Sequence, residues 1–151
     1  MIIRRATSAD AVATAELYLR ARRAGSADGA IPPLAHDDED TREWVTQVVI
    51  PTLECWLAEH ESGALVGMLV LEDDWIDQLY VDPDLTGAGI GAQLIAVAKR
   101  ERPDRLRLWT FASNAGAQRF YRRHGFHEVE RTDGGRNEEG APDILYAWSR
   151  A

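Results

Sequence analysis

Three alternating glycines, Gly87, Gly89 and Gly91, have the spacing in this sequence that most clearly predicts a chemical role. They open a segment in which apolar residues recur at helical spacing, namely Ile90, Leu94, Val97 and Ala98. The first turn of a helix has backbone N–H groups without partners and carries the positive end of the helix dipole. Glycine permits positive φ angles and lets an anion approach without a Cβ in the way. We therefore predict a phosphate cradle at this helix start.

Two other glycine-rich loops fit the same segment less well. Gly87 to Ala92 formally matches the dinucleotide fingerprint G-x-G-x-x-G/A, but five residues, Asp82 to Thr86, separate it from the preceding strand. A Walker loop needs lysine and then serine or threonine after its last glycine, and this sequence has Ala92 and Gln93. Neither nucleotide-binding loop is therefore expected.

The elements beside the cradle must position it. Trp75 to Val81 reads as a strand that places Trp75, Asp77, Leu79 and Val81 on one face and Ile76, Gln78 and Tyr80 on the other. Arg105 to Thr110 alternates in the same way and predicts the next strand. Asn114 to His124 then has aromatic and apolar residues at helical spacing, with Gly125 in place to end the helix.

The rest of the chain adds two helices and five strands. Ala9 to Arg23 predicts a helix with Val12, Ala15 and Leu19 on its apolar stripe, broken by Gly25 to Pro33. The acidic run Asp37 to Asp40 predicts the start of a second helix, because carboxylates are stabilised there, and a cation or substrate site is the alternative. The expected strands are residues 2–5, 53–60, 64–71, 126–131 and 144–148, the first of them short. This order predicts an α/β (α+β) architecture with a mixed sheet, in a single domain over residues 1–151.

The composition limits the classes of binding partner and the cellular compartment that we expect. The chain has 17 Lys and Arg against 25 Asp and Glu, a formal charge of −8. This charge argues against nucleic acid and mildly favours an amine-bearing small molecule or a basic peptide. The longest apolar run, Ala64 to Leu71, is too short to cross a membrane, and the first residues lack the order of a secretory signal. We therefore expect a cytoplasmic protein with no membrane contact.

Cysteine and histidine predict little chemistry here. The one cysteine, Cys55, cannot form an intrachain disulfide and is expected to be a small core residue. His124 and His127 lie three residues apart without a third ligand in the pattern, so no metal site is expected.

Two spaced motifs resemble those of the GNAT (Gcn5-related N-acetyltransferase) superfamily. Its acyl-CoA-binding motif has the core Gln/Arg-x-x-Gly-x-Gly/Ala, which Gly89, Ile90 and Gly91 match after the strand end Leu79 to Pro83. Further on, Asn114 to Phe126 follows the family order N-x-x-A-x-x-F-Y-x-x-x-G-F. The resemblance implies a GNAT-type fold, with a mixed, mostly antiparallel sheet of about six or seven strands and about four helices.

The resemblance also implies an activity and a way of binding the cofactor. The implied enzyme transfers an acetyl or other acyl group from acetyl-CoA to a primary amine of a small molecule or peptide, by direct attack in a ternary complex and without a metal. A non-catalytic acyl-CoA-binding sensor or interaction module is the alternative. The implied cofactor-binding residues are Leu79, Tyr80, Val81, Thr86, Gly87, Ala88, Gly89, Ile90, Gly91, Ala92, Asn114, Ala117 and Tyr121.

Two proton transfers need residues of their own. Tyr121 matches the family tyrosine that protonates the departing thiolate, and its alternative role is that of a core aromatic. No family motif marks the base that deprotonates the amine. Asp77 is the candidate because it lies up the strand from Val81, with Glu72, His36 and a water relay as alternatives, and it can equally be a plain solvent-facing residue. A backbone N–H near Val81 is expected to stabilise the oxyanion.

The sequence departs from the family pattern at the cradle. Thr86 stands where the family has Gln or Arg, and Ala88 where a basic residue is frequent. Either an arginine from elsewhere compensates or the affinity for CoA is modest. Arg119, Arg122 and Arg123 lie on the next helix, where a solvated face is the other interpretation.

The acceptor amine is not identified by any motif. The resemblance places its site at the regions Ser26 to Asp40 and Asn137 to Asp143. Their carboxylates agree with a cationic acceptor; these are Asp37, Asp38, Glu138 and Glu139. Family members often dimerise through their C-terminal strands, so a homodimer is left open.

Overall fold

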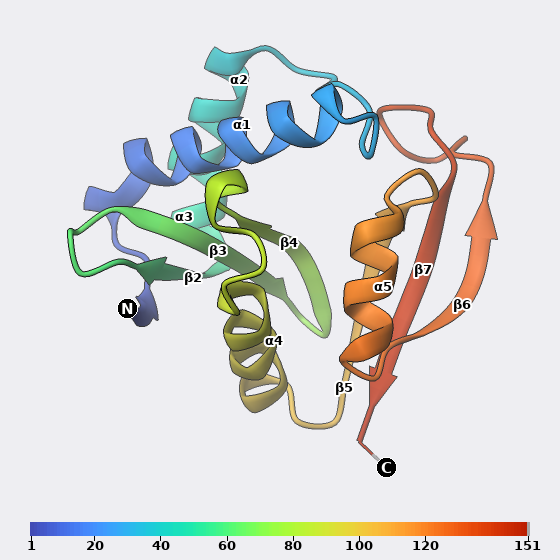
Figure 1. The fold of residues 1–151 in the computed structure, drawn as a ribbon. Coiled ribbons are helices and arrows are strands. Elements are labelled where there is room, and N and C mark those ends of the chain that lie inside the picture. The colour runs from blue at the N-terminus through green and yellow to red at the C-terminus, as the bar shows by residue number, and fades with distance from the viewer. Residues whose placement is uncertain (151) are drawn as a thin grey trace.

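The computed structural model describes residues 1–150, which build one seven-stranded mixed sheet in the order β1-β2-β3-β4-β5-β7-β6 (Figure 1). The strands are β1 (Ile2–Arg5), β2 (Glu54–Glu59), β3 (Leu65–Glu72), β4 (Trp75–Val81), β5 (Arg105–Phe111), β6 (His127–Thr132) and β7 (Asp143–Ser149). The helices are α1 (Ala11–Ala27), α2 (Asp38–Trp44), α3 (Ile50–Thr52), α4 (Ile90–Glu101) and α5 (Ala115–Arg123). The π-helical stretch η2 (Val45–Val49) joins α2 to α3, and η1 (Ser8–Asp10) and η3 (Pro83–Leu85) are short 3-10 helices. Because α2, η2 and α3 are continuous, the main helices form four segments. The mixed sheet and these four segments confirm the predicted fold class.

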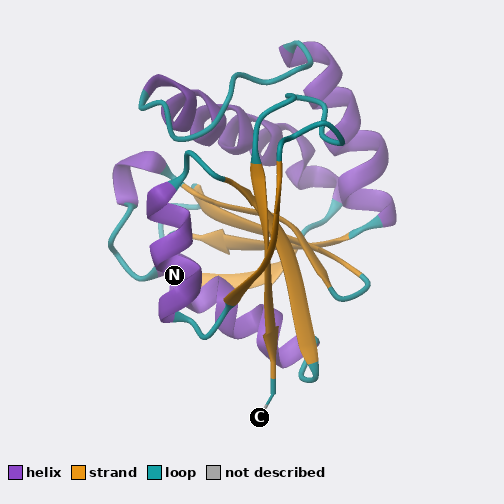
Figure 2. Cartoon of the chain, turned by 90° about the vertical axis from the view of Figure 1, so that its right-hand side faces the viewer, coloured by secondary structure: helices purple, strands orange, loops and turns teal. Residues whose placement is uncertain are grey.

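Each face of the sheet is covered by helices from a different part of the chain. One core lies under α4 and α5 and includes Leu94, Leu106 and Tyr146, all fully buried. The other lies under α1 and the α2 segment and includes Leu17 and Met68. Figure 2 shows the sheet between these two helical layers. Strand β3 contributes to both cores, which explains its unbroken apolar run. None of the helices in residues 1–150 combines the length and apolar character needed to cross a membrane.

Helix α1 differs from its prediction at both ends. It runs through Gly25 to Ala27, where the sequence predicts a break. Gly25 serves packing and not a chain break, because a Cβ there would lie 2.7 Å from the side chain of Ile31. Ala15 and Leu19 are buried as predicted, but Val12 is 77% exposed and lies outside the apolar stripe.

The acidic run begins helix α2, as predicted. The side chain of Asp37 accepts a hydrogen bond from the backbone N–H of Asp40 at 2.8 Å, which is N-cap geometry. The next residue, Asp38, pairs with Arg23 of α1. These contacts fix α2 beside α1 and set the position of the loop between them.

Strand β4 contains a bulge that the alternating sequence pattern does not reveal. Gln78 pairs with Val70 of β3, and Ile76 pairs with Leu71, so Asp77 is one extra residue between two paired positions. As a result, Ile76 lies in the core under α4 and α5 and not with Gln78 and Tyr80. The predicted assignment of Ile76 to their face is therefore wrong.

Strands β4 and β5 diverge after one contact. They are parallel neighbours, and in the described chain their register consists of the pair Trp75 and Arg107 at the start of both strands. Beyond this pair the two strands separate, as Figure 1 shows. The sheet therefore opens along a gap that the cavities of the next section occupy.

Candidate functional site

A groove of about 1010 Å³ runs between the start of α4 and helix α5, and we call it the glycine groove. Gly87 and Gly89 both have φ of +85°, a left-handed conformation that favours glycine. Among the described residues, no atom lies within 4 Å of a Cβ built on either one, so the space above them is open. Gly89 is the N-cap of α4, and the described residues provide no side-chain hydrogen bond to this cap. The free N–H groups and the open space fit a phosphate-bearing ligand.

Gly91 serves a different purpose from the other two glycines. A Cβ here would lie 3.0 Å from the ring of Phe120 on α5, which is a tight contact. Its missing side chain therefore lets α4 and α5 approach, while its backbone lines the groove beside Thr86, Ile90 and Ala92.

Helix α5 contributes positively charged side chains to the glycine groove. Arg119 and Arg123 line it, whereas Arg122 donates a hydrogen bond to the Tyr146 hydroxyl at 3.3 Å. The N–H of Ala88 donates to Leu85 within the turn, at 3.3 Å, and is engaged away from the groove. Two of the three arginines considered from the sequence are thus placed to compensate for the missing basic residues of the cradle.

A smaller cavity of about 240 Å³ fills the space between β4 and β5, and we call it the gap cavity. Its walls come from residues 76–80 of β4, residues 108–111 of β5, and α5. Asp77 and Tyr121, predicted from separate segments of the sequence, both line it. The structure therefore brings the two candidate catalytic side chains to one cavity.

The backbone of β4 also faces this gap. The N–H of Asp82 donates to Val66 of β3 at 2.8 Å. N–H and C=O groups alternate in direction along a strand, so those of Val81 and Leu79 point away from β3. They are directed toward β5, where the strands have separated, and can bind an extended ligand there.

Tyr121 is buried but its hydroxyl is available. The side chain is 8% exposed and packs edge-on against Phe120 and Phe126, with ring centroids 5.2 and 5.5 Å away. Burial raises the pKa of Tyr121, which keeps the hydroxyl protonated at neutral pH. Among residues 1–150 the Tyr121 hydroxyl makes no hydrogen bond to another side chain. It can therefore donate one to a ligand in the gap cavity.

Asp77 is exposed, so its side chain is open to solvent as well as to the gap cavity. Desolvation by the surrounding protein, and then the charge of Glu72, raises the pKa of the Asp77 carboxyl. Of the other candidates, Glu72 lines an adjoining cavity of about 290 Å³ that Asp77 also lines, and His36 lies in the α1–α2 loop and lines a different cavity. Asp77 is therefore the candidate base that shares a cavity with Tyr121.

Asn114 and Ala117 connect the first two spaces. The Asn114 side chain accepts a hydrogen bond from the Ala117 N–H at 3.1 Å and so caps α5. Both residues line the glycine groove and the gap cavity. The cap fixes the end of α5 at the junction of the two spaces.

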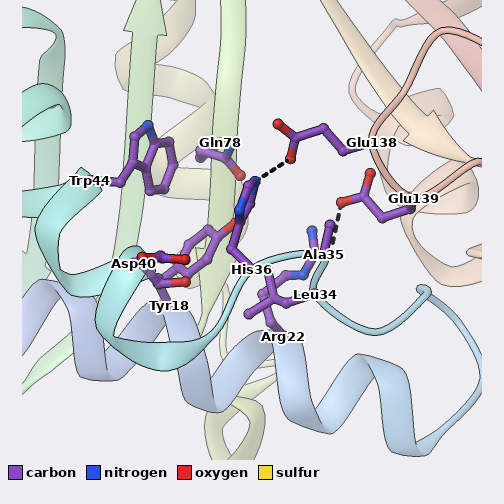
Figure 3. A pocket seen from close by; sticks show the side chains of 11 residues that line it. Tyr18, Arg22, Leu34, Ala35, His36, Asp40, Trp44, Gln78, Glu138 and Glu139 are labelled. Carbon is purple, nitrogen blue, oxygen red and sulfur yellow. Dashed lines mark hydrogen bonds and ion pairs between the residues drawn. The ribbon is translucent and has the colours of Figure 1, made fainter.

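A third space of about 410 Å³ lies under the α1–α2 and β6–β7 loops, and we call it the loop cavity (Figure 3). It is lined by Tyr18, Arg22, Leu34, Ala35, His36, Asp40, Thr41, Trp44, Gln78, Glu138 and Glu139. Glu138 and Glu139 lie where the sequence predicts an acceptor site. The predicted pair Asp37 and Asp38 is used instead for capping α2 and for binding Arg23.

The sequence analysis missed Arg22. Its guanidinium donates to the Tyr80 hydroxyl at 3.3 Å, and to the carbonyl of Pro32 and the carboxylate of Glu139 at 3.4 Å each. The side chain is only 6% exposed. The position of Arg22, one turn after Leu19 on the buried stripe of α1, could have predicted it. A charged residue buried there needs polar partners.

The three spaces form one path. The gap cavity shares Asn114 and Ala117 with the glycine groove, and it shares Arg22, Gln78 and Glu139 with the loop cavity. A ligand in the groove and a second one under the loops can therefore meet between β4 and β5. This arrangement suits a reaction between two substrates.

Cys55 lies outside this path. It is 1% exposed in the core, as predicted, and burial raises the pKa of its thiol to about 12. Within residues 1–150, no three His, Cys, Asp or Glu side chains converge as ligands for a metal ion.

Comparison with known proteins identifies the family. The sequence pattern of the "Acetyltransferase (GNAT) domain" family matches residues 51–128, just over half of the chain. The chain belongs to this family. The matched region contains the cradle, both strands at the gap, and helix α5.

Relatives and solved structures agree with this assignment. The "Peptidyl-lysine N-acetyltransferase YjaB" of Escherichia coli (strain K12) is 31% identical over 84 residues, which cover 56% of each chain. The chain thus spans about half the length of the curated relatives it matches. The solution structure of apo YjaB from Escherichia coli superposes over 100% of both chains with a TM-score of 0.77 at 24% identity. The PaiA N-acetyltransferase of Thermoplasma acidophilum, solved in complex with coenzyme A, covers 99% of this chain and 98% of its own, with a TM-score of 0.71 at 19% identity.

Proposed function

We propose that this chain is an N-acetyltransferase that transfers the acetyl group of acetyl-CoA to a primary amine by direct attack in a ternary complex. The observation that carries the proposal is the continuous path from glycine groove to loop cavity, with Asp77 and Tyr121 at its centre. The family assignment supports the same reaction.

The glycine groove is proposed to hold the phosphates. The N–H groups at the start of α4 and the side chains of Arg119 and Arg123 would bind the negative charge of CoA. The backbone groups of Leu79 and Val81 would bind the amides of the pantetheine arm as a neighbouring strand would. This binding directs the thioester into the gap cavity.

Two side chains would move the protons. Asp77 accepts a proton from the substrate ammonium, and the free amine then forms a C–N bond to the carbonyl carbon. The Val81 N–H donates to the oxyanion formed at this step. As the C–S bond breaks, Tyr121 gives its proton to the departing sulfur and regains one from the nitrogen. The products are an N-acetylated amine and CoA, with one proton released through Asp77.

Release of CoA is the direct test. Purified protein with acetyl-CoA and a panel of primary amines should release free thiol in proportion to the amine added. Calorimetry should detect acetyl-CoA binding in the absence of amine. Tight binding without amine-dependent release across the panel would contradict the proposed catalysis, and absence of binding would contradict the proposed groove as well.

A further inference from the structure

The loop cavity has more negative than positive charge. Glu139 is paired with Arg22, the sole Arg or Lys lining the cavity in residues 1–150, and Glu138 is 2.9 Å from His36. Asp40 has no basic side chain within 4.0 Å among the described residues. Three carboxylates outnumber the basic groups of the cavity even if His36 is counted as a cation, so the cavity has a net negative charge. A cationic occupant would therefore be attracted to this cavity.

The walls suit a cation on a hydrocarbon chain. Tyr18 and Trp44 meet edge to face with ring centroids 5.4 Å apart, and Leu34 adds an aliphatic contact. Aromatic faces bind both methylene groups and positive charge. Figure 3 shows Asp40, Tyr18 and Trp44 grouped on the α1 and α2 side of the cavity, with Glu138 approaching from the opposite loop.

The cavity also has a direction. Arg22, Gln78 and Glu139 belong to both the loop cavity and the gap cavity, whereas Asp40 and Glu138 line only the former. A molecule that reaches the gap cavity with one end therefore places its other end beside Asp40 and Glu138.

We propose that the acceptor is an aliphatic primary amine that carries a second positive charge, as a diamine does. Its reactive amine enters the gap cavity, and the distal cation lies between Asp40, Glu138 and the ring of Trp44. This inference rests on the proposed function and adds the class of acceptor to it.

A carboxylate at the distal end is the competing possibility, with Arg22 as its partner. Arg22 donates to Glu139, to the Tyr80 hydroxyl and to the Pro32 carbonyl, and its buried Nε has no hydrogen-bond partner among the described residues. An incoming carboxylate that bound this Nε would lie beside Glu139 and would share the cavity with Asp40 and Glu138, so three carboxylates would repel it. The structure therefore favours a distal cation.

The test varies only the distal group of the acceptor. Hexylamine, 1,6-diaminohexane and 6-aminohexanoate share one reactive amine and one chain, and end in a methyl, an ammonium and a carboxylate. We expect kcat/KM for the diamine to exceed that for hexylamine by about tenfold, with 6-aminohexanoate poorest, because charge-assisted contacts contribute more than neutral ones. The preference should weaken in high salt. The series is repeated with butyl and octyl chains, because six carbons need not be the chain length that fits the distance between the two cavities.

Two variants locate the effect. Asp40→Asn and Glu138→Gln should each narrow the ratio between diamine and monoamine by about threefold or more. Both residues are exposed, so the fold should persist, as thermal unfolding can confirm. Asp104→Asn and Glu61→Gln remove the same charges at exposed turns away from the cavity and should leave the ratio unchanged.

The outcomes separate the inference from the function on which it rests. Equal rates for diamine and monoamine at all three lengths, or preference for the carboxylate series, would overturn the inference while leaving acetyl transfer established. A preference that survives both variants would equally overturn it. If none of the amines releases CoA, the proposed function itself fails.

Discussion

The glycine groove and the loop cavity, the proposed sites of the two substrates, are built from different parts of the protein. One wall of the groove comes from a single short segment, residues 85–92, and acts mainly through backbone N–H groups. The loop cavity takes side chains from α1, α2, β4 and two loops that are far apart in the sequence. Backbone recognition depends on conformation and tolerates few substitutions, whereas the side chains of the loop cavity can change without altering the fold. The groove should therefore fix the cosubstrate, and the cavity should set the acceptor.

The largest effect is expected at Tyr121, which lies between the two regions. Tyr121→Phe removes the proposed proton donor and should lower kcat by about 10²–10⁴-fold, the usual contribution of general acid catalysis. The affinities for acetyl-CoA and amine should change little, because neither region loses a contact. Steady-state kinetics with calorimetry measures both. An unchanged kcat would remove Tyr121 from the mechanism.

Asp77→Asn tests the proposed base through the pH dependence of the rate. The raised pKa of Asp77 means that the wild-type rate falls as pH decreases through that pKa, because the protonated carboxyl cannot accept the proton of the amine. The variant should lose this acidic limb and be slower by about 10²-fold at neutral pH. A pH–rate profile of kcat/KM that keeps its acidic limb in the variant would assign the base elsewhere.

Gly89→Val tests the groove without touching the cavity. The left-handed φ of +85° costs a residue with a side chain about 1–2 kcal/mol of stability. The Val side chain would also fill the open space above the N–H groups, so the dissociation constant of acetyl-CoA should rise about tenfold. Gly63→Val is the matched control, since Gly63 has φ of +90° in the β2–β3 turn. Both variants should lose stability, but only the first should lose cosubstrate affinity. Equal affinity losses would mean that the groove is not the binding site.

Arg119→Gln and Arg123→Gln should have the smallest effects. Each removes one charge from the rim of the groove and should weaken acetyl-CoA binding by about fivefold, because exposed charge-assisted contacts contribute roughly 1 kcal/mol. The loss should shrink as salt is added. Arg150→Gln, at the exposed end of the chain, is the charge-matched control. A loss that is the same in all three variants would reflect net charge alone.

The contrast between the two regions also explains what the sequence could predict. The roles of Gly87 and Gly89 can be predicted, because positive φ at a helix start favours glycine. The seven strands can be predicted from alternating residues and apolar runs. The bulge at Asp77 is not readable, since an extra residue in a strand leaves the residue types in order and shifts only their faces. It misplaced Ile76 in the prediction.

The loop cavity was foreseen as a region and not as a set of side chains. Glu138 and Glu139 lie where expected, but choosing Asp40 over Asp37 depends on which carboxylate caps α2. Arg22 depends on contacts with Tyr80 and Glu139, residues 58 and 117 positions away in the chain. Local patterns carry no information about such distant contacts.

The single paired position between β4 and β5 has a consequence for stability. Because Trp75 and Arg107 are the registered pair between β4 and β5 in the described chain, the two halves of the sheet share few strand contacts there. Buried side chains from both halves join them in the core under α4 and α5. An extended molecule that hydrogen-bonds along β4 would bridge these halves and take the place of missing strand contacts. Acetyl-CoA would then act as a structural cross-link as well as a reactant, and at a hundredfold excess over its dissociation constant it would stabilise the folded chain by about 2.7 kcal/mol.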